Sequence, residues 1–291
     1  MSLDARVAPA ARVRRRLRVG EAARRAIAWG LLGAILGLTL VPIVLMLILS
    51  LKDNGQIYAR FWSPPSPYRW ENYVVGFLGI WRFAINSLIA TGASTALTVV
   101  LSAVAGFVFA RHRFPGKEPI YTAIIALLMI PPILTLIPAF VLVHQLGLVN
   151  THWALILPWA SGGQVFGILL CRSFFATLSE EFFEAARIDG ASELQALWYV
   201  AVPLSRSILV TLAIIRTITT YNNFIWPLIV ITDLSRQVIS VGLTQFTSNA
   251  GVIDLGPQMA AYVYATIPIL IIFLFGMRYY IQGLVSGGLK A

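Results

Sequence analysis

Charged side chains are scarce in this chain: Asp, Glu, Lys and Arg make up only 12% of its 291 residues, against roughly 25% in a soluble domain. Hydrophobic residues reach 58%, where a soluble domain has roughly 45–50%. So few polar groups cannot cover the apolar surface, and lipid is therefore the expected solvent. At this length we expect a single membrane domain.

Cysteine and histidine are also rare. The single cysteine, Cys171, excludes an internal disulfide and a cysteine-based metal site. The three histidines, His112, His144 and His152, lie near the ends of apolar segments and form no HExxH pattern. We therefore expect no metal site in this chain.

A nucleotide-binding loop is missing as well, since such a loop requires GxxxxGK followed by Ser or Thr. The one Gly116–Lys117 pair is followed by Glu118, and Arg111 stands where the first glycine should be. Clustered His, Asp, Glu or Cys residues, which an intramembrane enzyme would need, are absent from the apolar segments. The chain is therefore predicted not to be an enzyme and to bind no cofactor itself.

Six apolar segments are each long enough to cross about 30 Å of hydrocarbon as a helix of about 20 residues. They are 26–51, 82–110, 119–143, 153–171, 207–231 and 260–281. Backbone groups in lipid must be satisfied internally, which favours helices, and the alternation that a barrel requires is not seen. The first segment exceeds the about 7–15 residues of a signal-peptide core. The predicted fold is an all-α membrane protein, with six transmembrane helices in a domain at 26–291.

Positive charge predicts the orientation of these helices. Arginines crowd residues 1–25, and further Lys and Arg residues lie in 111–117 and 172–206, whereas 52–80 and 232–259 hold few. Because cytoplasmic loops are enriched in Lys and Arg, we expect both termini in the cytoplasm and a basic, flexible, lipid-facing arm at 1–25. A nucleic-acid-binding arm is disfavoured, because a strongly apolar chain follows it.

The segment 172–206 predicts two helices joined by a glycine turn. Ser179 fits an N-cap before two glutamates, which the helix dipole favours in the first turn. Gly190 is placed to end this helix in a left-handed conformation. Ser192 then fits the cap of a second helix, and Pro203 marks the turn toward the next span.

The first of these two helices carries an apolar side, formed by Phe182, Phe183 and Ala186. A short helical element of this kind is poorly stable alone and needs a surface to dock on. Two interpretations remain open from the residues. The helix packs on its own membrane domain, or it docks on another protein, for which the small Ala185 and Ala186 leave room.

The spacing within this segment resembles the EAA loop of ABC importer permeases. The motif is Glu184–Ala185–Ala186, three residues, Gly190, nine residues and then Val200–Ala201–Val202–Pro203. The family pattern ends in I-x-L-P, so valine replaces both aliphatic residues. The string 184–192 is similar to the carbohydrate subgroup, as are 86–87, 111–117, 146–151 and 283–291. The similarity covers nearly the whole chain after the arm and is greatest to the second permease subunit of maltose-type systems.

This resemblance implies a subunit of a multi-pass importer in the bacterial cytoplasmic (inner) membrane. Its implied partners are a second homologous permease, two ATPase subunits that carry ATP and Mg, and an extracytoplasmic substrate-binding protein. The implied cargo is a sugar or oligosaccharide. The residues implied to couple the chain to the ATPases are Glu184, Ala185, Ala186, Asp189, Gly190, Val200 and Pro203.

The fifth apolar segment contains an unusual charge, Arg216, followed by Tyr221–Asn222–Asn223. A charge at membrane depth costs at least about 2.5–3.5 kcal/mol on insertion scales and needs a partner or a wet cavity. An aromatic residue followed by Asn and a polar residue is common here in the carbohydrate subgroup, whereas the arginine is not. Our hypothesis places all four residues along the substrate pathway, where Arg216 favours an anionic sugar such as a uronate oligosaccharide. The alternative is a structural pair with the neighbouring permease.

A secondary carrier or channel, not coupled to an ATPase, is the competing interpretation of the whole chain. Such a protein would lack a docking loop and often contains inverted repeats of its spans. No clear internal repeat is found in this sequence. The long, motif-bearing segment at 172–206 therefore favours the importer subunit.

Overall fold

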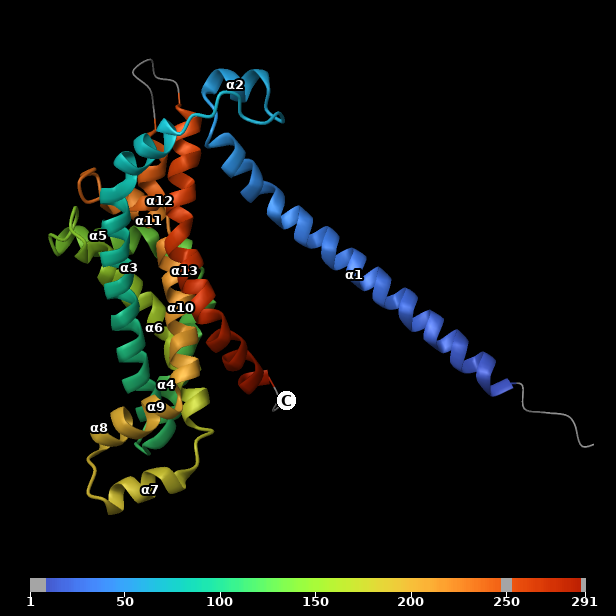
Figure 1. Cartoon of the computed structure of the whole chain (residues 1–291). Helices are drawn as coiled ribbons and strands as arrows, with labels where there is room; N and C mark the ends of the chain where they lie inside the picture. The colour runs from blue at the N-terminus through green and yellow to red at the C-terminus, as the bar shows by residue number, and fades with distance from the viewer. Residues whose placement is uncertain (1–8, 247–252, 289–291) are drawn as a thin grey trace, which may run out of the picture.

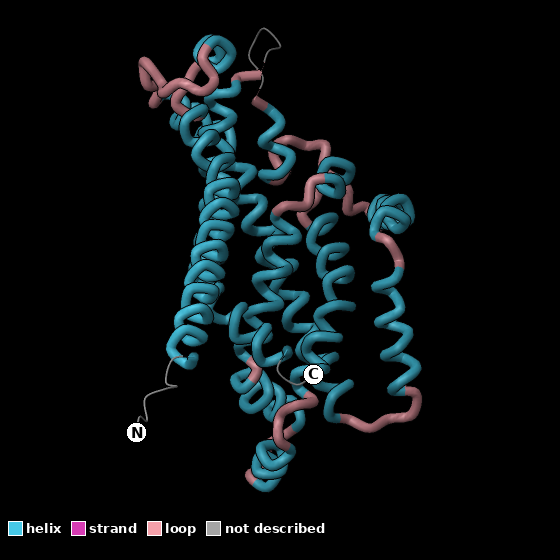
Figure 2. Tube along the Cα trace, turned by 90° about the vertical axis from the view of Figure 1, so that its right-hand side faces the viewer, coloured by secondary structure: helices cyan, strands magenta, loops and turns pink. Residues whose placement is uncertain are grey.

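The computed structural model describes residues 9–246 and 253–288, and every regular element in these ranges is helical. Four helices run side by side: α3 (Glu71–Arg111), α6 (Trp153–Phe175), α10 (Arg206–Tyr221) and α13 (Leu255–Gly288) (Figure 1, Figure 2). The most extensive helix pair is α3 with α6. Glycines bring these two helices together, because a Cβ on Gly106 would overlap Cys171 and one on Gly167 would overlap Ser102.

The number of spans depends on how bent helices are counted. Within the described residues, four helices are long and apolar enough to cross a membrane, and up to six spans result if each of two bent helix pairs forms one. The pairs are Lys117–Met129 with Pro132–Gln145, bent by 97°, and Glu193–Leu204 with Arg206–Tyr221, bent by 81°. The prediction of six spans therefore corresponds to the upper number.

The third predicted segment, 119–143, is not the single helix that we expected. It consists of α4 (Lys117–Ala126), η1 (Leu127–Met129), η2 (Pro132–Thr135) and α5 (Leu136–Gln145), and α5 points away from the bundle (Figure 1). The break lies at Pro131–Pro132, where each proline lacks an N–H and pushes the preceding residue into an extended conformation. Ile130 and Pro131 have ψ angles of 115° and 130°.

The fifth predicted segment, 207–231, is also broken, so the expectation of one continuous helix was wrong. Helix α10 ends at Tyr221, and a short α11 (Ile225–Val230) follows after Asn222–Phe224. Pro227 has no N–H with which to continue a helix back to the carbonyl of Asn223. That carbonyl instead accepts a hydrogen bond from Ser240 Oγ at 2.7 Å.

Several helices begin earlier than predicted. Helix α3 begins at Glu71 and not at residue 82, and α13 begins at Leu255 and not at residue 260. The segments predicted as loops at 52–80 and 232–259 contain α2 (Asn54–Ala59), α12 (Ile239–Gly242) and η4 (Leu243–Gln245). At 1.5 Å per residue, a 41-residue α3 is about 60 Å long and must extend beyond about 30 Å of hydrocarbon.

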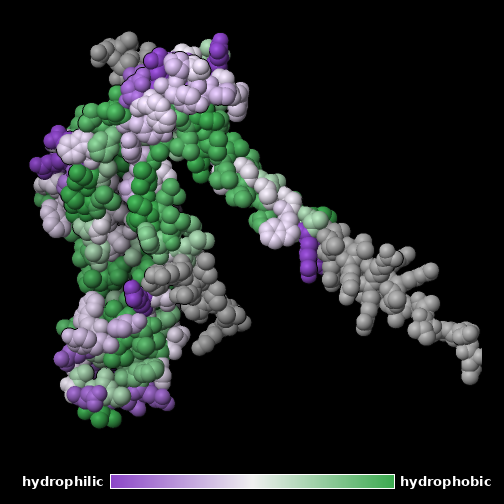
Figure 3. All heavy atoms as spheres, in the orientation of Figure 1, coloured by the Kyte–Doolittle hydropathy of each residue, from purple (hydrophilic) through white to green (hydrophobic). Residues whose placement is uncertain are grey.

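Helix α1 (Pro9–Leu49) leaves the bundle at an angle and packs on the chain only near its C-terminal end (Figure 1). It reaches back to Pro9, so residues 9–25 of the predicted arm are helical where composition suggested a flexible segment; residues 1–8 lie outside the described residues. Arg and Ala are good helix formers, which explains the extension. Hydrophobic residues cover much of α1 and of the bundle, whereas hydrophilic ones gather toward the α2 and α7 ends (Figure 3).

Candidate functional site

The helix α7 (Glu180–Ile188) lies at the far end of the bundle from α2 (Figure 1). Ser179 is its N-cap residue, as predicted, although the hydroxyl makes no capping hydrogen bond. Gly190 has a φ of 79°, which confirms the predicted left-handed end. Its N–H donates to Arg187 O at 3.0 Å and the N–H of Ala191 donates to Ala186 O at 2.9 Å, the bond pair of a Schellman motif.

A second helical stretch follows through α8 (Glu193–Gln195), η3 (Ala196–Ala201) and α9 (Val202–Leu204). Ser192 and Gln195 form the capping box that begins it, which confirms Ser192 as the cap. The N–H of Val202 donates to Leu197 O, the spacing of a π turn. The chain bends at Ser205, just beyond the predicted turn at Pro203.

Helix α7 presents two different faces. Phe183 is only 2% exposed and packs among residues of the bundle, whereas Phe182 is 52% and Ile188 86% exposed. The prediction that Phe182 and Phe183 share one side was wrong, because adjacent helical residues point about 100° apart. The two interpretations drawn from the sequence thus apply to different faces of α7. The face with Phe183 packs on its own chain, and the face with Phe182 and Ile188 stays exposed.

The residues predicted to couple to an ATPase gather at this end of the molecule. Glu184, Ala185, Asp189, Gly190 and Pro203 are exposed, and Ala186 and Val200 are half-buried. Glu184 forms no ion pair with any described residue. An uncompensated carboxylate and exposed apolar side chains on a protruding helix can contact a second protein without first breaking contacts of their own.

Arg216 lies between α10 and α6. Its Nη2 donates to the backbone carbonyl of Trp159 at 2.8 Å, and the guanidinium fills the space beside Gly163, where a Cβ would lie 2.5 Å from Nε. The buried Nε has no hydrogen-bond partner, and no acidic residue in the described ranges forms an ion pair with this arginine. The positive charge is thus held by α6 but not neutralised by a carboxylate.

The other predicted pathway residues point in different directions. Tyr221 is buried and its hydroxyl donates to Ala265 O on α13 at 2.9 Å. Asn222 is exposed and donates to Ile218 O, within its own helix. Asn223 lines a sizeable cavity, whereas Tyr221 bonds to α13 and Asn222 to its own helix, so the contacts of these three residues do not converge on one point.

That cavity has a volume of about 540 Å³ and lies between the broken third segment, α6 and α11. Trp159 and Trp226 line it together with Asn223, and the indole N–H of Trp159 is buried without a partner. Sequence reasoning did not single out these tryptophans. The sequence feature that could have indicated them is that each tryptophan lies next to a proline, Pro158 or Pro227. Helix breaks are tolerated in membranes where the backbone lines a cavity.

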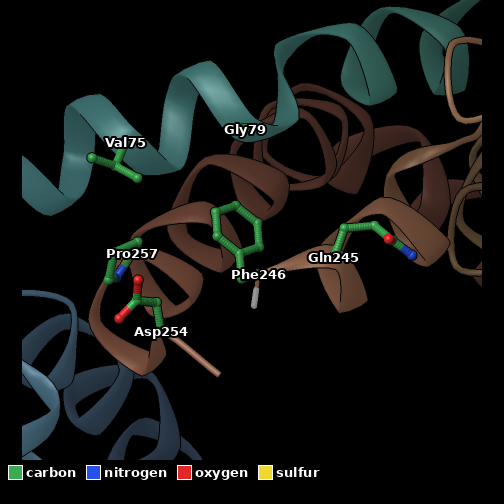
Figure 4. A pocket seen from close by; sticks show the side chains of 6 residues that line it. All are labelled: Val75, Gly79, Gln245, Phe246, Asp254 and Pro257. Atoms are coloured by element: carbon green, nitrogen blue, oxygen red, sulfur yellow. The ribbon is translucent and has the colours of Figure 1, made fainter. Parts of the chain in front are cut away.

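A smaller cavity of about 230 Å³ lies toward the α2 end, between α3 and the N-terminal part of α13 (Figure 4). The ring of Phe246 lies against α3, where a Cβ on Gly79 would be 2.8 Å from it. Asp254 supplies a carboxylate at the rim. Within the described ranges, no group of three His, Cys, Asp or Glu residues could hold a metal ion.

The sequence is similar to those of known transport proteins. The chain is 35% identical over 250 residues to the probable ABC transporter permease protein YurM of Bacillus subtilis, covering 86% of this chain and 83% of the relative. It is 32% identical over 268 residues to the trehalose/maltose transport system permease protein MalG of Thermococcus litoralis, covering 89% and 95%.

A solved structure of a bacterial ABC transporter involved in the import of the acidic polysaccharide alginate shares the fold. One of its chains matches with a TM-score of 0.79 at 20% identity, covering 90% of this chain and 98% of that one. Residues 99–285 match the family model described as the inner membrane component of binding-protein-dependent transport systems. This match spans more than half of the sequence, and the chain therefore belongs to that family of multi-pass inner membrane proteins.

Proposed function

We propose that this chain is the permease subunit of an ABC importer that moves a sugar or oligosaccharide into the cytoplasm, while separate ATPase subunits hydrolyse the ATP. The names of its relatives support the cargo class: besides MalG, they include the diacetylchitobiose uptake permease NgcG of Streptomyces coelicolor and the arabinooligosaccharide permease AraQ of Bacillus subtilis. The observation that carries the coupling is the protruding, half-exposed helix α7.

In this proposal the α7 end faces the cytoplasm. The basic residues of 9–25 and of 111–117 lie toward that end, because the N-terminal part of α1 and the C-terminal part of α3 extend toward it, as does the C-terminal part of α13 (Figure 1). Enrichment of Lys and Arg on the cytoplasmic side supports this orientation. The exposed face of α7, with Glu184 and Gly190, then docks on an ATPase, and the α2 end faces the substrate-binding protein.

A second, homologous permease is proposed to pack against α1. None of the apolar window of this helix is buried within the chain. Gly33 and Gly37 lie one turn apart on α1 with nothing within 4 Å of a built Cβ. Small residues at this spacing let two membrane helices approach closely, and the pair supports α1 as a contact between permeases.

Co-purification from native membranes tests the coupling. An ATPase subunit should be recovered with the tagged wild-type chain and be lost with Glu184→Lys or Gly190→Asp. Tyr58→Lys, a change at an exposed residue of α2, is the control and should leave recovery unchanged. If no ATPase is ever recovered with the wild-type chain, the proposed function is wrong.

A second candidate is narrower: the cargo is anionic, such as a uronate oligosaccharide. Arg216 favours it, because its charge has no carboxylate partner among the described residues and its Nε is unsatisfied. The fold shared with an importer of acidic alginate is consistent with this cargo. In the competing account, Arg216 pairs with an acidic residue of the second permease.

Substrate uptake in cells with and without the gene distinguishes an anionic cargo from a purely structural role of Arg216. The panel holds a neutral maltose-like oligosaccharide, a uronate oligosaccharide and glycerol phosphate. If the cargo is anionic, deletion abolishes only the uptake of an anionic compound, and Arg216→Ala reduces that uptake while Arg216→Lys retains more of it. Preserved uptake of the anionic substrate in Arg216→Ala would contradict a pathway role for this arginine.

A further inference from the structure

One guanidinium joins the ends of three helices. Arg111 is the last residue of α3, and its side chain is only 10% exposed. Nη2 donates to Phe175 O, at the end of α6, at 2.8 Å and to Leu178 O at 2.6 Å. Nη1 donates to Glu180 Oε2, in the first turn of α7, at 2.8 Å. Arg111 thus contacts α3, α6 and α7 at the same time.

The surroundings hold this guanidinium in place. Two of its contacts are carbonyls at or just beyond the end of α6, where unsatisfied carbonyls and the helix dipole favour a cation. Its Cζ also lies 4.2 Å from the centre of the Phe183 ring, the buried aromatic residue of α7. Phe107, one turn earlier on α3, packs against both Phe183 and Phe175. The planar guanidinium of Arg111 therefore makes hydrogen bonds and a ring contact in several directions, which a lysine ammonium could not reproduce.

Charged groups continue the link across α7. Glu180 also accepts a hydrogen bond from Arg187 Nη1 at 3.0 Å, and Arg187 lies 3.8 Å from Glu193 at the start of α8. Glu193 in turn lies 3.5 Å from His112, the residue after Arg111. The polar contacts therefore begin and end at the C-terminal end of α3, with α7 between them.

We propose that Arg111 is the positioning residue through which a displacement of α7 is passed to α3 and α6. The inference rests on the proposed coupling of α7 to an ATPase, and it assigns a role to a residue outside the docking motif. Arg111 lies beneath α7, where it pairs with Glu180, and within the described residues no hydrogen bond or ion pair joins it to Glu184 or Gly190. Its loss should leave docking intact but separate ATP hydrolysis from movement of the spans.

Arg172 offers a matched control. It lies on the last turn of the same helix α6, donates to Glu118 at 2.8 Å and stacks on Tyr121 with its Cζ 3.6 Å from the ring centre. It therefore has the same kinds of partner as Arg111, a carboxylate and an aromatic ring. These partners belong to α4, however, so Arg172 does not connect to α7.

The experiment compares Arg111→Gln with Arg172→Gln in the full complex, reconstituted in lipid vesicles with its binding protein. Three quantities are measured: the amount of ATPase that co-purifies, the basal ATP hydrolysis, and the stimulation of hydrolysis and uptake by loaded binding protein. For Arg111→Gln we expect normal ATPase recovery and basal hydrolysis, with stimulation and uptake reduced at least about fivefold, the lower end of typical coupling factors. Arg172→Gln should stay within about twofold of wild type.

Several outcomes would overturn the inference. Stimulation and uptake near wild type in Arg111→Gln would show that the link is not needed. Equal damage in Arg172→Gln would show a general effect of losing an arginine that pairs with a carboxylate and an aromatic ring. Loss of the ATPase from Arg111→Gln alone would make this residue part of docking. If the wild-type chain recruits no ATPase, the proposed function fails and the link fails with it.

A second variant tests the proposal even if Arg111→Gln does not fold. Glu180→Gln removes the negative charge that pairs with Arg111 and also with Arg187, and it leaves the carbonyl contacts of Arg111 in place. It should lower the stimulated hydrolysis without changing basal hydrolysis or ATPase recovery. An unchanged stimulation in this variant would contradict the proposal.

Discussion

Gly106 of α3 and Cys171 of α6 lie in such close contact that a Cβ added to the glycine would overlap the cysteine Cβ. The backbone nitrogen of Arg172 would also lie only 3.0 Å from that added atom. This contact fixes the approach of the two helices whose ends Arg111 joins. The distance between α3 and α6 thus depends on the lack of a Cβ at Gly106 as well as on the side chains that pack between the helices.

Replacing Gly106 by alanine should destabilise the protein, although alanine is the better helix former. Overpacking a core typically costs about 1–3 kcal/mol, which exceeds the ~0.5–1 kcal/mol gained from replacing a helical glycine. Gly92→Ala on the same helix is the control, because nothing lies within 4 Å of its added Cβ, and it should be neutral or stabilising. Unfolding of both variants in detergent checks the opposite signs; a stabilised Gly106→Ala would contradict the close contact.

Gly190→Ala should loosen the end of α7. A left-handed conformation costs an ordinary L-residue roughly 1–2 kcal/mol, and asparagine tolerates it better. We therefore expect faster amide exchange at Ala191, whose N–H is bonded to Ala186 O, in Gly190→Ala than in Gly190→Asn. Hydrogen exchange followed by mass spectrometry measures this difference, and equal protection in wild type and Gly190→Ala would refute the role of the turn.

Lys52→Met should weaken the region between α1 and α2. Lys52 is fully buried and its Nζ donates to Arg60 O at 2.7 Å and to Phe61 O at 2.8 Å. Methionine fills a similar volume but donates nothing, and a hydrogen bond to a charged group contributes about 1.5–3 kcal/mol. Arg60→Met is the control, because the side chain of Arg60 is exposed, and it should change the thermal unfolding temperature little. A similar fall in unfolding temperature in both variants would contradict the role assigned to Lys52.

The pKa of Asp53 predicts a pH-dependent contribution to stability. Hydrogen bonding from the Gln56 N–H, followed by the pairing with Arg69, holds the pKa of this carboxyl below its ordinary value of 3.8. A lowered folded-state pKa stabilises the folded protein above 3.8, and this contribution is lost as the pH falls through the lowered value. Asp53→Asn should therefore be less stable than wild type at about pH 7, and the two unfolding temperatures should converge as the pH falls below 3.8. A difference in unfolding temperature between wild type and Asp53→Asn that does not change with pH would contradict this role of the Asp53 carboxylate.

The sequence predicted those parts of the fold that depend on local pattern. The caps at Ser179 and Ser192 and the glycine turn at Gly190 were found because each depends on residues a few positions away. Hydropathy located the spans but not their breaks, because one apolar run does not reveal that Pro131 and Pro132 turn the chain through a sharp bend.

Contacts between distant segments could not be predicted. The partner of Arg216 is the backbone carbonyl of Trp159, which has no side-chain signature. Phe182 and Phe183 look alike in sequence, and contacts with distant residues such as Phe107 on α3 decide that Phe183 is buried. The role of Arg111 likewise depends on three helix ends that meet in space.

The central claim is that sugar import by this chain is driven by ATP through α7. Right-side-out membrane vesicles, loaded with ATP and supplied with the binding protein and its sugar, test it most directly. The account predicts accumulation that requires internal ATP, survives collapse of the ion gradients and is lost in Glu184→Lys. Accumulation that follows an ion gradient, needs no ATP and persists in Glu184→Lys would contradict it and would identify a secondary carrier.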